Sequence, residues 1–537
     1  MMSKVTVGLD FGTHQTKVCI EDASNPFLKR YTFFRFEDLA GTSSFVLPSI
    51  VQINKDDTLS YGFMDELLAN SLQFEVEEPE PFFFPEFVPA TSPTRPVMRN
   101  YPERPLVAKR SFNLRDLASL LGRDRLQVEY RLRCNQIDQE NKVLSQDYKL
   151  KLDSYQKAEE ERRSKWELEH AGVFEDYKRK LHQIETKRNK LLRFRYFKSA
   201  ALGDNRYWDF DTAEYNPRLI SVLYLAFVLY SVEKVYGADV FVQMGVPQTL
   251  GSPEGEQISE SGCRLLILAR KLTMDWSLEE FLTLKYSELK QLVNLDQVFD
   301  ETVKNEFGVK TLPEAYAGLV ALTAQRRIPN GFSLLIDIGG GTTDIALFTL
   351  ANDQRGPDIA QVVSVKGGLN SIIHVISEGL GQPMASIQSN FPTLIATESG
   401  ERAREVLNES LRGSISSIVG NLFDQFMSLH REHGLSKDHL AKALHSRPIF
   451  YCGGGGIYPE LRESMIYFTD VKQVSLGEMA IQNLTNIVSA PFDTILAVSY
   501  GLSINSDENV ICTPPEELFK HLIRSSDENS YSRDYND

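Results

Sequence analysis

The sequence has few cysteines, and they are not arranged as a site. The five residues Cys19, Cys134, Cys263, Cys452 and Cys512 are scattered and show no CxxC spacing. A disulfide framework or a structural zinc site is therefore not expected, and a reducing, cytoplasmic compartment fits.

Long apolar runs are also lacking. The most apolar stretch, residues 219–232, is shorter than the roughly 20 residues that a membrane-spanning helix needs, so we expect a buried core helix there. The N-terminus does not resemble a signal peptide, because Asp10 interrupts the short apolar stretch after Lys4. We therefore expect no association with membranes.

Excess positive charge is absent from the chain as a whole. The formal net charge of −15 argues against general affinity for nucleic acid. This average hides residues 123–198, where 20 Lys/Arg stand against 14 Asp/Glu, a local charge of +6 that leaves −21 for the rest.

Residues 123–198 contain no proline, and Gly172 is their only glycine. Apolar residues recur there at spacings of three and four, which predicts a coiled-coil-like helical arm folded back as a hairpin. Such an arm suits a protein partner, and the alternative is a solvated hairpin packed only on itself. Residues 75–105 instead carry eight prolines and predict an extended arm or ordered loop.

A chain of 537 residues is too long for one core, so two or more domains are expected. From about residue 215, helix-like and strand-like segments alternate, which predicts an α/β protein. The polar, acidic stretch from about Asn505 predicts a disordered tail.

Three glycine turns carry the functional signal. The first lies in a predicted hairpin over residues 4–20, where Gly12 permits a tight turn whose amides can bind an anion. Asp10 precedes this turn and suits a hydrated magnesium ion. A plain hairpin is the alternative. Additional donors are available from Thr13, His14, Gln15 and Lys17.

The second turn lies in residues 334–348, LLIDIGGGTTDIALF, and repeats this form. Its aspartate is Asp337, and the turn itself is Gly339, Gly340, Gly341, Thr342 and Thr343. The third turn, Gly453, Gly454, Gly455 and Gly456, follows a predicted strand and precedes a predicted helix, an arrangement common at anion sites.

In this order the three turns resemble the phosphate-1, phosphate-2 and adenosine motifs of the Hsp70/actin/sugar-kinase ATPase superfamily. The second is most similar to the Hsp70 form D-L-G-G-G-T-x-D. Residues 106–112, LVAKRSF, resemble the Hsp70 segment DAKRLIG and put Lys109 at the phosphate-facing lysine of that family. The similarity spans roughly residues 4–505.

Two connecting motifs depart from the family. In LPEAYAGL (312–319), the acidic position falls on Leu312, and Glu314 lies two places later, so Glu314 supplies the carboxylate after a small shift or the position is lost. In KGGLNSI (366–372), Gly367 and Gly368 are kept, but the usual aspartate is missing. These departures are compatible with slow ATP hydrolysis or with nucleotide binding without turnover. We also expect no Hsp70 peptide-binding domain after residue 505.

The resemblance implies a two-lobed actin-like ATPase fold, with duplicated RNase H-like domains, a helical coiled-coil insertion, and ATP or ADP in the cleft. It implies that Asp10 and Asp337 position magnesium through water, that the glycine turns hold the nucleotide, and that Lys109, Glu314 and Thr342 act in hydrolysis. The implied function is an Hsp70-like ATPase that regulates a partner protein. The alternatives are an actin-like filament former, a nucleotide-binding scaffold with little hydrolysis, and a small-molecule kinase.

The resemblance also implies a division of the chain into a first lobe with its peripheral subdomain and a second lobe with its own. The predicted segments are 1–40 and 215–330 for the first core, 41–214 for its periphery, 331–372 and 445–505 for the second core, 373–444 for its periphery, and 506–537 for the tail.

Overall fold

The computed structural model describes most of the chain in mixed α/β structure. The described residues are 5–25, 28–37, 41–54, 56–64, 87–104, 117–188, 192–323, 331–350, 357–433, 448–462, 470–477, 481, 483–486, 488, 492–504 and 510–519. The chain forms two compact units, one of residues 1–78 with 184–537 and one of residues 79–183.

The first unit contains a mixed sheet built on the first predicted hairpin. Strands β1 (Val5–Phe11) and β2 (Gln15–Asp22) pair antiparallel, and β3 (Arg30–Phe33) continues antiparallel beyond β2. On the other side, β10 (Val240–Val246) and β11 (Val309–Pro313) are parallel to β1. The order is β11-β10-β1-β2-β3, with β6 (Leu47–Pro48) paired to the start of β2.

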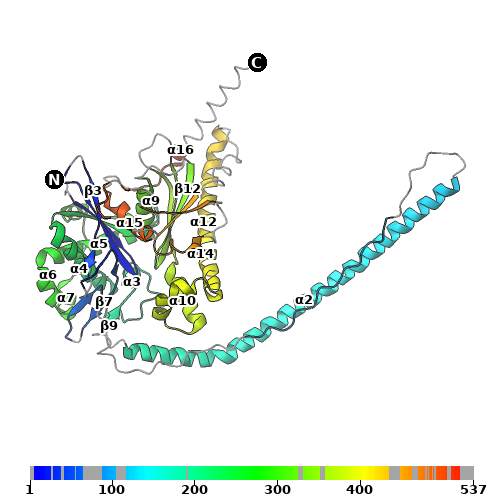
Figure 1. Cartoon of the computed structure of the whole chain (residues 1–537), viewed down its shortest axis with the longest axis horizontal. Helices are drawn as coiled ribbons and strands as arrows, with labels where there is room; N and C mark the ends of the chain where they lie inside the picture. Colours follow the sequence, from blue (N-terminus) through cyan, green and yellow to red (C-terminus); the bar gives the residue numbers. More distant parts are fainter. Residues whose placement is uncertain are drawn as a thin grey trace, which may run out of the picture. The chain divides into compact units, whose positions relative to one another are not determined.

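A second sheet repeats this topology around the second predicted hairpin. Strands β12 (Gly331–Ile338) and β13 (Thr342–Leu350) form the hairpin, and β14 (Asp358–Lys366) lies antiparallel beyond β13. Strands β15 (Pro448–Cys452) and β16 (Asp470–Gln473) lie parallel on the side of β12. Each sheet is therefore a hairpin with one antiparallel neighbour and two parallel ones (Figure 1).

Helices α4 (Pro217–Tyr236) and α5 (Pro253–Asp275) pack together in the first core. Both begin with a proline that follows a capping side chain, Asn216 for α4 and Ser252 for α5. Among the described residues, α4 is the one helix long and apolar enough to cross a membrane by length and composition, but most of it is buried in this core. The prediction of a core helix over residues 219–232 is confirmed.

The second core lies between the second sheet and three helices, α10 (Leu369–Leu380), α11 (Met384–Leu394) and α12 (Glu398–His433).

The short elements of the first unit are β4 (Phe36–Glu37), β5 (Ser43–Ser44), β7 (Val51–Ile53), β8 (Leu59–Tyr61), β9 (Leu192–Phe194), α3 (Phe197–Ala201), α6 (Leu278–Thr283), α7 (Tyr286–Leu292), α8 (Glu301–Glu306), α14 (Pro459–Arg462) and α16 (Pro515–Leu518).

A third core joins the two sheets through a pair of exchanged helices. Helix α9 (Glu314–Thr323) follows β11 of the first sheet but contacts β12 and β13 of the second. Helix α15 (Asp493–Ser503) follows β16 of the second sheet but contacts β1 and β2 of the first. The two helices meet at Gly501, where an added Cβ atom would overlap the carbonyl oxygen of Ala317. Glycine is required for this close approach.

The second unit differs from the predicted helical hairpin. Helix α2 (Leu117–Arg188) runs uninterrupted through Gly172 for 72 residues, as Figure 1 shows. One glycine lowers helix stability by only about 1 kcal/mol and does not end a helix without capping contacts. The predicted end at residue 198 is also wrong, because residues 192–194 already form β9, which pairs with β7.

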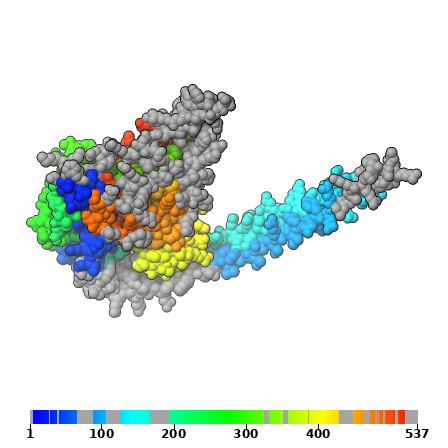
Figure 2. All heavy atoms as spheres, turned by 45° about the horizontal axis from the view of Figure 1, so that its top comes forward, coloured from blue at the N-terminus to red at the C-terminus, as the bar shows by residue number. Residues whose placement is uncertain are grey.

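An extended segment, residues 87–104, covers the apolar seam of α2 in place of a second helix. It runs antiparallel: the Tyr155 hydroxyl donates to the Ala90 carbonyl at 2.7 Å, and the Arg99 amide donates to Asn141 at 2.8 Å. The Ala90 amide also donates to Glu159 at 3.1 Å, so the nine residues from Ala90 to Arg99 span the 18 helical residues from Glu159 to Asn141. Nine residues in polyproline II geometry would advance about 28 Å, which matches the roughly 27 Å rise of 18 helical residues. The two run side by side in Figure 2. The partly buried seam residues recur at spacings of three and four: Tyr130, Cys134, Ile137, Asn141, Leu144, Tyr148, Leu152, Tyr155 and Glu159.

Part of the predicted disordered tail is ordered. Leu518 and Phe519 are buried in the second core, where the Phe519 ring packs on Phe332 and Phe426. The Thr513 amide donates to the Ile359 carbonyl at 2.8 Å and extends the attachment. Composition concealed this anchor because its apolar residues are scattered in a stretch that is polar and acidic on average.

The helix exchange predicts a large effect at one glycine. Gly501→Ala should lower the free energy of unfolding by about 2 kcal/mol or more, because the added methyl group has no room against Ala317. Gly413→Ala, inside α12 and with open space at the added Cβ, should instead raise it by roughly 0.5–1 kcal/mol. Urea unfolding of both variants measures this difference. Equal effects of the two substitutions would contradict the close contact of α9 with α15.

Candidate functional site

The two hairpin turns meet each other. A Cβ atom added at Gly341 would lie 3.2 Å from the Thr13 hydroxyl and 2.6 Å from the Ser199 hydroxyl. A Cβ atom added at Gly340 would lie 3.1 Å from the Thr13 side chain. The turns of the two topologically equivalent hairpins are thus in contact although about 330 residues separate them in the chain.

Each turn needs its glycines for a local reason. An added Cβ at Gly12 would overlap the Gln15 carbonyl, and the Ser49 hydroxyl donates to the Gly12 carbonyl at 2.7 Å. The third turn lies beside the second: Gly453 has a φ of +77°, and a Cβ there would overlap the Asp337 carboxylate. The Gly455 amide donates to the Ile338 carbonyl at 2.8 Å. Gly454 and Gly456 complete this loop, so the structure brings together all three predicted glycine turns.

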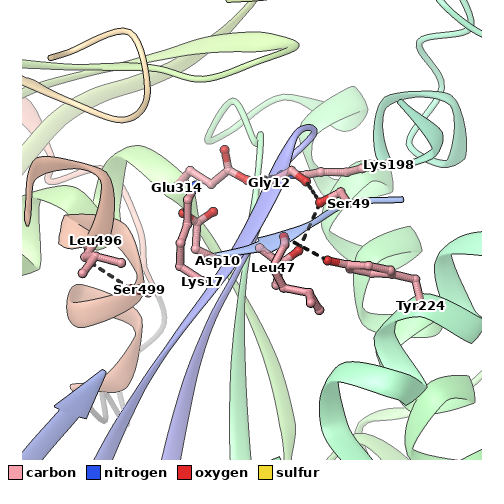
Figure 3. Close-up of polar contacts among 11 residues, drawn as sticks. Asp10, Gly12, Lys17, Leu47, Ser49, Lys198, Tyr224, Glu314, Leu496 and Ser499 are labelled. Carbon is pink, nitrogen blue, oxygen red and sulfur yellow. Dashed lines mark hydrogen bonds and ion pairs between the residues drawn. The ribbon is translucent and has the colours of Figure 1, made fainter. Parts of the chain in front are cut away.

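A buried cluster of charged side chains lies where the turns meet. The Lys17 ammonium donates to Asp10 Oδ2 at 3.0 Å, and the Lys198 ammonium donates to Glu314 Oε1 at 2.5 Å. All four side chains are buried, and Figure 3 shows them grouped around the first hairpin. They come from β1, β2, α3 and the first residue of α9.

Two further carboxylates make the cluster acidic. Burial, and then the Glu314 and Asp10 carboxylates, raise the pKa of Asp337 to about 7. Burial, Glu314 and Asp337 raise the pKa of Asp344 well above its usual range. Burial alone would lower the pKa of Lys198, but Glu314 and Asp10 outweigh it and raise that pKa. Four carboxyl groups therefore share this site with two ammonium groups, an arrangement that favours an added cation.

The donor set fits a hydrated cation better than a directly bound one. Across the described ranges, no group of three or more His, Cys, Asp or Glu side chains is arranged to hold a metal ion directly. Magnesium usually keeps several of its water molecules and is often bound through one or two carboxylates. Asp10 and Asp337, each at the end of a central strand, are the groups that such an ion would use.

Lys198 is a site residue that the sequence analysis missed. It lies on α3, ten positions after the last residue of α2 at Arg188, and no motif around it resembles a known phosphate lysine. Its burial beside Glu314 results from the tertiary fold and could not be predicted from the sequence around it. The predicted lysine, Lys109, lies outside the described residues.

Glu314 joins the cluster despite its displaced position in the sequence. It begins α9 directly after Pro313 ends β11, and its carboxylate reaches Lys198. This strand-to-helix junction thus places Glu314 in the cluster, two places after the position that the resemblance implies. Leu312, which aligns with the acidic position, is buried in the third core instead.

The two threonines of the second turn have different roles. Thr342 donates to Asp344 Oδ2 at 3.0 Å and lies at the cluster. Thr343 is fully buried and donates to the Gly367 carbonyl at 2.7 Å. Successive strand residues point to opposite faces, so the side chain of Thr343 points away from the cluster that Thr342 and Asp344 face.

Gly367 and Gly368 brace the second turn. An added Cβ at Gly368 would lie 2.9 Å from the Thr342 carbonyl oxygen and 3.0 Å from that of Gly340. The following amides, Leu369 and Asn370, donate to the carbonyls of Gly339 and Gly340 at 3.0 and 2.8 Å. The segment that begins with these two glycines therefore supports the second turn through contacts with the carbonyl groups of that turn.

His14 connects the first turn to the helices of the second sheet. Its Nε2 atom is hydrogen-bonded to Asn370 on α10, and its Nδ1 atom lies 3.3 Å from the Gln388 side-chain nitrogen on α11. Burial lowers the pKa of His14 to about 4, with Asn370 opposing and Arg195 and Lys17 adding to the shift. A neutral ring with its proton on Nε2 satisfies both contacts. Gln15 is exposed at the start of β2.

A cavity of about 350 Å³ adjoins the cluster. Thr13, Lys198 and Thr342 are among its lining residues, so it borders the contact between the two turns.

Comparison with known proteins adds no assignment: no family model matches this chain, and no curated protein matches it significantly.

The charge cluster predicts a specific pH dependence of stability. Asp337 binds its proton up to about pH 7 in the folded chain but only up to about pH 4 when unfolded, so it lowers stability as the pH rises through this window. Asp337→Asn should gain stability relative to the parent protein over the same window, by up to about 4 kcal/mol. Urea unfolding without nucleotide or magnesium, at several pH values, measures the difference.

Asp204→Asn is the matched control for this measurement. Burial opposes the shift, but the hydrogen bonds and charge of Arg206 lower the pKa of Asp204. Its substitution should therefore cost stability above about pH 4, the opposite sign. If the stability of both variants relative to the parent protein changed with pH in the same direction, the buried cluster would not be the origin of the effect.

Proposed function

We propose that this chain is an Hsp70-like ATP-binding protein with the two-lobed, actin-like ATPase fold, and that it hydrolyses ATP slowly with magnesium. One observation carries the proposal. The turns of two equivalent hairpins, from two sheets of the same topology, meet over a buried cluster of carboxylates and lysines. Glycine turns of this kind are suited to phosphates, and the cluster is suited to a hydrated cation.

The residues divide into three roles in this proposal. The backbone around Gly12–Thr13 and Gly339–Thr342 holds the β- and γ-phosphates, and Gly453–Gly456 face the adenosine. Asp10 and Asp337 hold magnesium through water. The ion, when bound, supplies positive charge to the phosphate oxygens.

Lys17 and Lys198 neutralise charge in the proposed reaction. Each already contacts a carboxylate of the cluster, Asp10 and Glu314 respectively, so each is held in place before a nucleotide arrives. Glu314 has a carboxylate beside the γ-phosphate position and orients the attacking water. Phosphoryl transfer depends mainly on such positioning and electrostatic stabilisation.

The connection between α2 and Lys198 supports control of a protein partner. The chain leaves α2 at Arg188, forms β9 at Leu192–Phe194, and enters α3, which carries Lys198. A partner bound to the arm of residues 79–183 is thus linked to a site lysine by one short strand and a turn. We propose a cytoplasmic location, which is compatible with the five unpaired cysteines.

The alternatives differ from this proposal in what they would show. A nucleotide-binding scaffold would bind ATP with little turnover. A filament former would give nucleotide-dependent light scattering. A small-molecule kinase would release ADP with a phosphorylated acceptor in place of inorganic phosphate.

Two lysines provide the sharpest test of the catalytic assignment. Lys198→Met should slow single-turnover ATP hydrolysis by roughly 100- to 1000-fold, the usual cost of removing one donor aimed at developing charge. Lys109→Met should leave the rate essentially unchanged. The reverse result would return the phosphate-facing role to Lys109. Lys198→Arg, which keeps the charge beside Glu314, controls for loss of folding.

Calorimetric titration with ATP, ADP and magnesium tests the binding itself, with Asp337→Ala as the control. We expect the parent protein to bind both nucleotides and Asp337→Ala to lose the contribution of magnesium. Binding without turnover would select the scaffold alternative. No binding of either nucleotide would reject the proposed function.

A further inference from the structure

The long helix α2 carries a second line of apolar side chains besides the seam that residues 87–104 cover. Among the α2 residues whose side chains the structure describes, five large apolar ones are more than half exposed. Four of them, Val128, Leu132, Val143 and Leu150, are 52%, 61%, 63% and 70% exposed. Single exposed apolar residues are ordinary on protein surfaces, but a regular line of them indicates an interaction surface.

These four side chains point to one side of the helix. At about 100° per residue they fall within an arc of roughly 60°, which we call the open stripe. The covered seam is centred roughly 170° away, so the open stripe faces away from the extended segment. The fifth exposed residue, Leu126, lies about 120° from the centre of the open stripe and is not part of it.

Amide side chains fill the remaining positions of the open stripe. Asn135, Gln139 and Gln146 are exposed and lie between the apolar residues on the same side of the helix. Together with them they recur at spacings of three and four residues, as in the contact line of a coiled coil. Amides at such positions restrict the registers in which two helices can pair, because each amide needs a hydrogen-bonding neighbour.

A parallel, in-register pair of these helices matches the layers. Each residue then faces its own copy, so Leu132 meets Leu132 and Gln146 meets Gln146, whose amide both donates and accepts. An antiparallel pair centred on Gln139 would instead place Leu132 against Gln146. It would also place Val143 against Asn135. Both contacts would set an amide against an apolar side chain that offers it no hydrogen bond.

The charges beside the open stripe favour the same arrangement. Between residues 128 and 150, the charged side chains within about 100° of its centre are acidic on one side and basic on the other. In a parallel pair, the acidic side of one helix faces the basic side of its copy, whereas in an antiparallel pair like charges face each other. The acidic side consists of Glu129, Glu140 and Asp147, and the basic side of Arg131, Lys142 and Lys149.

The acidic side chains already have basic neighbours on the surface of the arm. Three ion pairs involve them: Glu129 with Arg125 at 3.3 Å, Asp147 with Lys151 at 2.6 Å, and Glu140 with Arg99 at 2.8 Å. Ion pairs on a solvated surface contribute little to stability. They therefore do not prevent the same carboxylates from facing the basic side of a second helix.

We propose that the open stripe is a pairing surface for a second copy of this chain, in which two α2 helices lie parallel and in register. The contact extends over about 33 Å, because the 22 steps from Val128 to Leu150 rise about 1.5 Å each. A contact of two single helices over this length is small, so the dimer is reversible. The pairing goes beyond the proposed function and does not depend on nucleotide binding.

Sedimentation velocity of the full-length protein, from about 1 to 200 µM, tests the pairing. We expect a monomer–dimer equilibrium with a Kd of about 10 µM. Leu132→Glu, which places a charge in the open stripe, should weaken the dimer at least about tenfold. Leu126→Glu is the matched control and should leave the Kd unchanged, because Leu126 is 56% exposed on the same helix but lies outside the stripe. Circular dichroism should show equal helix content in both variants.

Cysteine cross-linking tests the direction of the pair. Gln146→Cys places two thiols opposite each other in the parallel pair, so mild oxidation should produce a disulfide-linked dimer. In the antiparallel pair the new thiol would face Leu132 and stay unlinked. Ser145→Cys is the matched control, because Ser145 is exposed but points away from the open stripe. It should give no more cross-linked dimer than the parent protein with its five cysteines.

The outcomes separate this inference from the proposed function. A monomer at every concentration, or a dimer that Leu132→Glu and Leu126→Glu weaken equally, would overturn the pairing surface. A dimer sensitive to Leu132→Glu that Gln146→Cys does not cross-link would overturn the parallel arrangement. ATP binding by calorimetry should be the same for Leu132→Glu and the parent protein. A dimer that binds no nucleotide would support the pairing and reject the ATPase.

Discussion

The structure depends on a buried excess of carboxylate at the place where two sheets meet. Among the described residues, Asp10, Glu314, Asp337 and Asp344 lie with two lysines, Lys17 and Lys198, so the remaining negative charge favours protonation or an added cation. Proteins rarely retain such a cluster for stability alone, because neutral packing of the same volume is usually at least as stable. The raised pKa of Asp337 expresses this cost. A bound cation would offset the repulsion among these carboxylates. Cation binding and the stability of the fold therefore depend on the same buried charges.

The cluster can form because the sheets are held together by exchanged helices. Helix α9 leaves the first sheet to cover the second, and α15 does the opposite, so each sheet is partly completed by a helix from the other half. The close approach at Gly501 sets how near these helices come. Since Glu314 is the first residue of α9, the packing that joins the halves also delivers one carboxylate to the site.

The sequence predicted correctly those features that depend on residues close together in the chain. Glycine turns after apolar strands predicted both hairpins and the third turn, because the backbone conformation there depends on neighbouring residues. Lys198 was not predictable, since its role comes from burial beside Glu314, which is 116 residues away in the chain. The fold-back of the helical arm was wrong for a related reason: periodicity reveals an apolar seam but not what covers it, and here an extended proline-rich segment does. The sequence did not distinguish Thr342 from Thr343, because strand alternation and not residue type decides which threonine side chain faces the cluster.

The junction between α2 and α3 is the structural connection on which the proposed control of a protein partner would depend. Tyr196 caps α3 with a φ of 61°, a left-handed conformation that a tyrosine adopts only when its surroundings enforce it. Its ring lies 5.7 Å from that of His14, which in turn contacts α10 and α11. The strained residue thus stands between the long helix, the first turn and Lys198. Tyr196 therefore joins the start of α3, which carries Lys198, to the first turn through its ring contact with His14.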